Sequence, residues 1–172
     1  MGDYVSIADS AIPGAVRKGD WDASATINHT GGFKKFDNAW KSSNGLTFTL
    51  VDLVSKGGTY LMNVGATAEG IIPRPIPSIL KSVGDWLKVN GEAIYGAGPS
   101  PFGDEFSRGN DETSPPRSAQ PVSPSSITWR CTTKPGKLFV TVFQWPDGPL
   151  ELNQVTNKVT GLTCFPTNRA LC

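Results

Sequence analysis

The sequence predicts an α/β fold, and two observations support this prediction. Between Gly57 and Gly96, a short apolar run, a Gly-containing loop, a helical stripe opened by prolines and a further glycine follow one another. This succession is typical of a strand and the helix that follows it in a parallel sheet. From residue 127 onward, short β-type runs alternate with Pro-Gly turns instead, which predicts an antiparallel β unit after the α/β part.

The first helix is expected to begin near Ser42 and Ser43, because serine side chains cap helix amino termini well. Four apolar residues then recur at helical spacing: Leu46, Leu50, Leu53 and Val54. Gly57 and Gly58 would end this helix. Leu46, Phe48 and Leu50 also alternate at strand spacing, so a strand is the second interpretation of this segment.

A buried parallel strand is expected next, over Thr59 to Val64, because this apolar run lies between glycines. Ala66 to Pro77 would then be the loop at its carboxyl end, and Pro75 and Pro77 can open a helix. The expected helix carries an apolar stripe and ends at Gly91. The stripe consists of Ile79, Leu80, Val83, Trp86 and Leu87.

The remaining segments are less regular. Asp20 to Trp40 is polar and aromatic with glycines at its centre, which indicates a functional loop. Gly96 to Ser126 is rich in Pro, Ser and Gly and indicates a connection. Three strands are expected after it: Ile127 to Thr133, Leu138 to Trp145 and Leu150 to Leu152. The predicted division is therefore 1–98, a connection over 99–126, and a β unit over 127–172.

Charge and composition exclude several functions. The chain has 172 residues, a formal net charge of +1 and no basic or acidic block, which argues against nucleic-acid partners. No apolar run approaches the ~20 residues that span a bilayer, and the amino terminus does not read as a signal peptide. Three widely spaced cysteines do not form a zinc pattern. Cys164 and Cys172 can pair, but we expect both to be unpaired thiols.

Several segments together resemble one enzyme family. They read GDYVSIADSAIP, DWDASATINHTGGFKKFDNAWKS, LVDLVSKGGTYLMNVGATAEGIIPRP, GDWLKVNGEAIYG and RCTTKPGKLFVTVFQWP. In this order and spacing they resemble the α-L-fucosidases of glycoside hydrolase family 29. The resemblance runs from Gly2 to about Thr160. It implies the last βα units of a (β/α)8 TIM-type barrel, followed by an incomplete antiparallel β-sandwich.

The resemblance also implies a reaction. Enzymes of the family hydrolyse α-L-fucosides from glycans with two carboxyl groups, which a retaining mechanism places ~5–5.5 Å apart. No metal or organic cofactor is implied. The nucleophilic Asp of the family lies on an earlier strand, and a complete barrel takes roughly 250 residues. We therefore expect no nucleophile in this chain, and the isolated chain to be inactive.

The acid/base is the catalytic role that the resemblance can assign here. Asp22, after Trp21, matches the Glu of the family's Trp-Glu pair. Its carboxylate is one methylene shorter, and a displacement of about 1 Å can cost on the order of a hundredfold in rate. Asp9 is a weaker alternative, and the simplest alternative is that Asp22 caps a turn. Trp21 is a candidate for contact with the substrate.

Three further positions are candidates for binding the sugar. Gly31 stands where the family usually has an aromatic residue, and Phe33 or Phe36 could fill that space. His29, the only histidine, is either a proton shuttle or a hydrogen-bonded loop residue. Asn63 either orients a substrate hydroxyl or anchors a loop. Glu69 is expected in a turn, and the tryptophans Trp40, Trp86 and Trp145 in the core.

Two functions therefore remain open. The first is a C-terminal piece of an α-L-fucosidase that acts on fucosylated glycans. The second is a degenerate, non-catalytic remnant or a carbohydrate-binding fragment, favoured by Asp22 in place of Glu and by Gly31. A partial barrel would leave strand edges open, so self-association through these edges is expected. The family is typically secreted, periplasmic or lysosomal, and this chain carries no address of its own.

Overall fold

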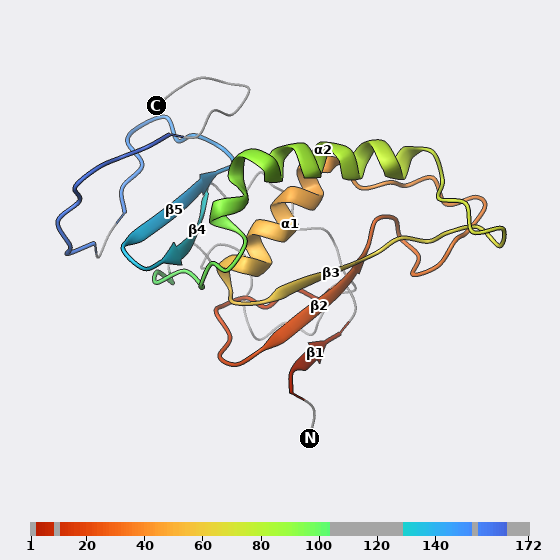
Figure 1. Ribbon diagram of the computed structural model, residues 1–172, viewed down its shortest axis with the longest axis horizontal. Coiled ribbons are helices and arrows are strands. Elements are labelled where there is room, and N and C mark those ends of the chain that lie inside the picture. The colour runs from red at the N-terminus through yellow and green to blue at the C-terminus, as the bar shows by residue number, and fades with distance from the viewer. Residues whose placement is uncertain (1–2, 9–10, 104–128, 153–154, 165–172) are drawn as a thin grey trace.

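A parallel three-stranded sheet, two helices that cover one of its faces, and a β-hairpin beside the helices make up the structure (Figure 1). It is a computed structural model that describes residues 3–8, 11–103, 129–152 and 155–164. The strands are β1 (Val5–Ile7), β2 (Trp21–Thr26), β3 (Thr59–Asn63), β4 (Trp129–Lys134) and β5 (Lys137–Val142). The helices are α1 (Ser43–Ser55), α2 (Pro75–Asn90) and the single 3-10 turn η1 (Gly91–Ala93).

The sheet has the order β1-β2-β3, and both pairings are parallel. Val5 lies opposite Trp21, and Thr26 lies opposite Asn63. Helix α1 is the crossover between β2 and β3, as a parallel pair requires. The loops that follow β2 and β3 therefore leave the sheet at the same edge, formed by the carboxyl ends of the strands.

Strand β2 follows a strict alternation that the sequence contains. Trp21, Ala23 and Ala25 are buried, whereas the residues between them are only half-buried. Trp21 and Ala23 pack with Leu53 of α1, so the odd-numbered residues face the helices. A second cluster joins the end of β2 to both helices through Ile27, Leu46, Ile76 and Val83.

Both helices begin and end where the sequence predicts. The Ser42 hydroxyl accepts a hydrogen bond from the Gly45 amide at 3.1 Å and caps α1. Gly57 follows the helix with φ 85°, a left-handed conformation that favours glycine. Helix α2 runs from Pro75 to Asn90, and Gly91 caps its end.

The Trp21 indole leaves no room at Gly58, where an added Cβ would lie 2.3 Å from the ring.

Four expectations about secondary structure and burial are wrong. Residues 21–26 form a strand rather than part of an irregular loop, because their small polar residues alternate with buried ones. Strand β3 is parallel but not buried, since it lies at an edge of the sheet. No strand forms over Leu150 to Leu152, and Trp145 lies exposed on the surface instead of in the core.

The cysteines also differ from expectation. Cys164 is disulfide-bonded rather than an unpaired thiol. Cys172 lies outside the described residues. Cys131 is buried on β4, and its thiol lies 3.6 Å from the Thr132 carbonyl. None of the described helices has the length and hydrophobicity that crossing a bilayer would require.

Candidate functional site

The face of the sheet that points away from the helices is predominantly polar. The side chains on this polar face are, by alternation and register, Ser6, Asp22, Ser24, Thr26, Thr59, Leu61 and Asn63. Leu61 is its one large apolar residue and is largely exposed. No described helix lies on this face (Figure 1). Parallel sheets usually have apolar cover on both faces, so a polar face is uncommon and its side chains are candidates for a binding or catalytic surface.

Asp22 occupies the amino-terminal half of β2 on the polar face, opposite Thr59 in the neighbouring strand. Its Oδ1 is buried and has no hydrogen-bond partner among the described residues. Thr26, four residues further on, is about 13 Å closer to the carboxyl edge at an ordinary strand rise. The structure therefore separates Asp22 from the carboxyl edge. Asp9 lies outside the described residues.

Trp21 does not share a surface with Asp22. Its indole packs in the core against Leu53 of α1, on the opposite side of the sheet. Its Nε1 is buried without a partner in the described part of the chain, as is the hydroxyl of Tyr60. Burial raises the pKa of Tyr60 to about 12. Trp21 Nε1 and the Tyr60 hydroxyl are thus two buried polar atoms on the helix side of the sheet that have no hydrogen-bond partner among the described residues.

The loop after β2 is held at its base by Asp37, a residue that the sequence analysis did not select. Asp37 Oδ2 accepts hydrogen bonds from the Asn28 amide side chain at 3.2 Å, the His29 backbone amide at 3.2 Å and the Thr30 hydroxyl at 3.1 Å. Desolvation favours the neutral acid, but hydrogen bonds from Ala39, Thr30 and His29 outweigh it and lower the pKa of Asp37. The side chain of His29 itself is exposed.

Asn63 and Gly31, two predicted site residues, are brought together. The Asn63 side-chain amide donates to the Gly31 carbonyl, which joins the end of β3 to the loop after β2. Gly65 lies against the same loop, since an added Cβ there would meet the Gly32 carbonyl carbon at 2.8 Å. Gly31 faces open space, and the Phe36 ring nearby in sequence is 83% exposed. This arrangement fits the loop-anchoring role expected as one alternative for Asn63.

Lys41 is a second residue that the sequence analysis missed. It is half-buried at the end of the loop, and its Nζ donates to the Thr26 carbonyl at 2.6 Å. Its backbone amide donates to the Ile27 carbonyl at 2.9 Å. Desolvation lowers the pKa of Lys41. Asp37 and Lys41 both lack a periodic signal, and only their position in a loop between a strand and a helix points to them.

The other predicted residues have structural positions, and no metal site forms among the described residues. Glu69 is in an exposed turn, as expected. Trp40 packs against the Ile27 cluster, and Trp86 is half-buried. Within the described ranges, no three His, Cys, Asp or Glu residues are grouped so that they could hold a metal ion.

Comparisons with known proteins identify the family. The fold and the polar face define a parallel α/β protein with its candidate residues on the sheet and at the carboxyl ends of the strands. A model of the family described as α-L-fucosidase matches residues 1–92. The chain belongs to the α-L-fucosidase family, a family of glycoside hydrolases.

Individual relatives agree with this assignment. Plasma α-L-fucosidase of Rattus norvegicus is 38% identical over 97 residues, which are 55% of this chain and 21% of that protein. Tissue α-L-fucosidase of Mus musculus is 28% identical over 165 residues, 94% of this chain and 32% of that protein. The solved structure of α-L-fucosidase isoenzyme 1 from Paenibacillus thiaminolyticus has a TM-score of 0.70 and 29% identity. That match covers 88% of this chain and 32% of the solved one.

The chain therefore spans about a third or less of the length of the relatives it matches. Residues responsible for activity in those proteins can lie in the part that this chain does not match. The activity of a whole α-L-fucosidase does not follow for this chain from the family alone.

Proposed function

We propose that this chain is the C-terminal part of the catalytic barrel of an α-L-fucosidase, followed by the beginning of its β-sandwich. Its reaction, once the barrel is complete, is hydrolysis of α-L-fucosides from glycans by the retaining two-carboxylate mechanism. The observation that carries the proposal is the polar face, where Asp22 has a buried oxygen without a partner among the described residues. This carboxylate lies within the segment that matches the family model.

In this proposal Asp22 is the acid that protonates the leaving oxygen and then the base that activates water. The nucleophilic carboxylate comes from barrel strands outside this chain. Asn63 holds the Gly31 carbonyl and thereby shapes the loop beside the sugar. Gly31 offers no ring to the sugar, and the exposed Phe33 and Phe36 are the aromatic residues of the same loop that can take this place.

The test is a reconstructed enzyme in which a related α-L-fucosidase supplies the upstream barrel strands. Asp22→Ala should lower the turnover of natural fucosides by roughly a hundredfold to ten-thousandfold, because proton transfer contributes about that much. Aryl fucosides with good leaving groups should be affected less. Ser82→Ala, at an exposed position of α2 away from the polar face, is the control and should have little effect. Equal turnover of natural fucosides in both variants would exclude Asp22 and direct the search to Asp9.

Two further substitutions separate proton donation by Asp22 from sugar binding at Gly31. Asp22→Glu should raise turnover, because the added methylene restores the reach of the proton donor. Gly31→Trp should act mainly on KM by giving the sugar an apolar platform, and the space around Gly31 can hold a side chain.

The second candidate is a non-catalytic remnant that binds carbohydrate. It is favoured by the place of Asp22, about 13 Å from the carboxyl edge at which barrel enzymes carry their active sites. Titration of the chain with L-fucose, followed by the amide resonances of the loop after β2, tests binding directly. Binding by a reconstructed enzyme that hydrolyses no fucoside would support the remnant and contradict the catalytic proposal.

A further inference from the structure

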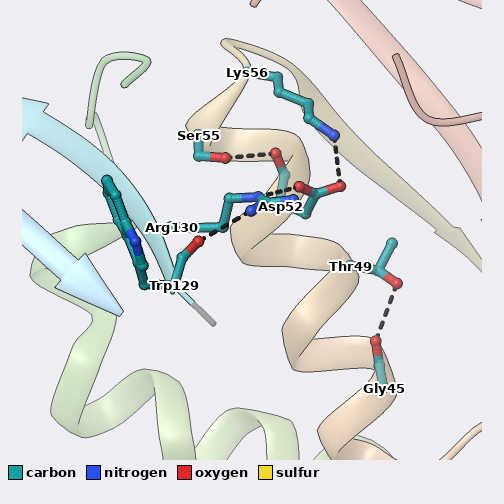
Figure 2. A network of polar contacts seen from close by, with 7 residues as sticks. All are labelled: Gly45, Thr49, Asp52, Ser55, Lys56, Trp129 and Arg130. Carbon is teal, nitrogen blue, oxygen red and sulfur yellow. Dashed lines mark hydrogen bonds and ion pairs between the residues drawn. The ribbon is translucent and has the colours of Figure 1, made fainter. Parts of the chain in front are cut away.

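Three charged side chains are buried together where helix α1 meets the β-hairpin. Asp52 of α1 is 1% exposed, Arg130 of β4 is 2% exposed, and Lys56 at the end of α1 is also buried. Figure 2 shows Arg130 reaching across from its strand to the carboxylate of Asp52. Buried charges of this kind are uncommon, because removing them from water costs several kcal/mol for each ion.

The contacts satisfy both oxygens of the carboxylate. Asp52 Oδ2 pairs with Lys56 Nζ at 2.8 Å, and Asp52 Oδ1 pairs with Arg130 Nε. Arg130 Nη1 also donates to the Trp129 carbonyl at 3.0 Å, which fixes the guanidinium relative to its own strand (Figure 2). Asp52 therefore joins a cation at the end of its own helix to a cation on β4, 78 residues further along the sequence.

Neighbouring contacts hold the hairpin against the same part of the chain. The Ser100 amide donates to the Ser55 carbonyl at 2.8 Å, so residues beyond α2 return to the end of α1. The buried Thr132 hydroxyl donates to the Ala93 carbonyl at 2.7 Å. The rings of Phe48 and Phe143 meet edge to face, with their centroids 4.9 Å apart. The buried ions thus lie at the centre of an apolar and hydrogen-bonded junction.

We propose that Asp52 and Arg130 form an ionic strap that fastens the β4–β5 hairpin to α1, so that hairpin and helix open as one unit. Separating the hairpin alone would break the contact between Asp52 and Arg130 and leave Asp52 with Lys56. Breaking a contact between buried charges is strongly destabilising where the carboxylate that remains in the interior loses part of its compensation. By this argument the hairpin belongs to the folding unit of α1 rather than to an independent domain.

The chain offers a matched control on the same hairpin. Lys137 of β5 pairs with Glu92 at 2.6 Å, but the two side chains are 58% and 44% exposed. Exposed pairs of this kind contribute little, because water screens them and long side chains lose freedom on pairing. Breaking this pair tests whether an exposed ion pair also holds the hairpin in place, or whether only the buried pair does.

The experiment is native-state hydrogen exchange on the whole chain. In the unsubstituted protein, the amides of β4 and β5 should reach the same opening free energy as those of α1, with the same dependence on denaturant. Asp52→Asn should speed exchange in the hairpin on the order of a hundredfold. Lys137→Met should leave it within about threefold. If, in the unsubstituted protein, α1 is protected and the hairpin is not, or neither is protected, the proposal is wrong.

A third variant covers the case in which Asp52→Asn does not fold. Asp52→Leu, Lys56→Met and Arg130→Met together remove all three charges and keep the apolar volume. Buried charge clusters can be replaced in this way with little loss of stability. The variant should therefore fold, but exchange in the hairpin should become faster than in α1, because the ionic contact between them is gone. If the hairpin and α1 keep equal opening free energies in this variant, the ions do not fasten the hairpin, and the proposal fails.

Discussion

Buried polar groups are treated in opposite ways at two places in this molecule. At the junction of α1 and β4, both oxygens of Asp52 have cationic partners. On the sheet, Asp22 Oδ1 is buried with no partner in the described part of the chain. An unpaired buried polar atom costs about 1–3 kcal/mol, so the two places have different physical meaning. The carboxylate at the junction has cations on both oxygens, whereas Asp22 Oδ1 has no hydrogen-bond partner among the described residues.

The largest expected effect is on catalysis. The isolated chain should show no hydrolysis of an aryl α-L-fucoside above buffer, because the mechanism needs two carboxyl groups and the family resemblance places only one here. A continuous absorbance assay measures this, with the Asp22→Ala variant of the isolated chain as control. Turnover that a fucose-type inhibitor abolishes would contradict the prediction. It would direct the search for a nucleophile to Asp3, Asp9, Asp20 and Asp22.

A second large effect concerns association through the open sheet. We propose that the isolated chain self-associates, because the described parallel sheet has open edges and one face that no described helix covers. Size-exclusion chromatography with light scattering and a thermal melt measure this. Val5→Lys on the exposed strand β1 should reduce association, and Val16→Lys in the loop after β1 is the control. A monodisperse monomer with a sharp melt would show that this sheet needs no cover.

A moderate effect tests the packing beneath the polar face. Gly58→Ala should lower the free energy of unfolding by about 1–3 kcal/mol, because the new methyl group would overlap the buried Trp21 ring. Gly84→Ala in α2 meets nothing within 4 Å and should instead stabilise by about 0.4–1 kcal/mol. Chemical denaturation of both variants gives the comparison. Equal changes in the two would mean that the indole is free to move.

The smallest expected effect is a pH dependence of the loop after β2. The pKa of Asp37 in the folded protein lies below its ordinary value of 3.8. Its charged form therefore supports the loop fully above pH 3.8, and this support is lost as the pH falls through the lower folded value. Exchange of the His29 amide should accelerate over that acid range beyond the intrinsic pH effect. Asp37→Asn should remove the dependence, and its persistence in that variant would assign it to another group.

The regular elements were predictable where apolar residues repeat clearly. Helix α2 and the end of α1 agree with expectation, because prolines, glycines and a continuous stripe mark them. Strand β2 was missed although Trp21, Ala23 and Ala25 alternate with polar residues, because alanine, serine and aspartate have weak strand preference. Strand β1 has only three residues, which is too short for a periodic signal.

The candidate site was predictable only in part. Asn63 lies at the end of its strand and contacts the loop, as its position in the sequence suggested. The network of Asp37 depends on a loop folding back over nine residues, and no spacing in the sequence encodes that return. The distance of Asp22 from the carboxyl edge depends on the register of β2 with β3, which local patterns do not specify.

The contact at Gly65 has a consequence for how this loop can change in evolution or in the laboratory. Any side chain at this position would overlap the backbone of Gly32 and Phe33, so the two loops cannot vary independently. Variants of Gly65 should survive in a mutational library only together with changes in residues 31–33. The residues that fit in the loop with the candidate sugar contacts are therefore restricted by Gly65, which follows a strand more than thirty positions further along the sequence.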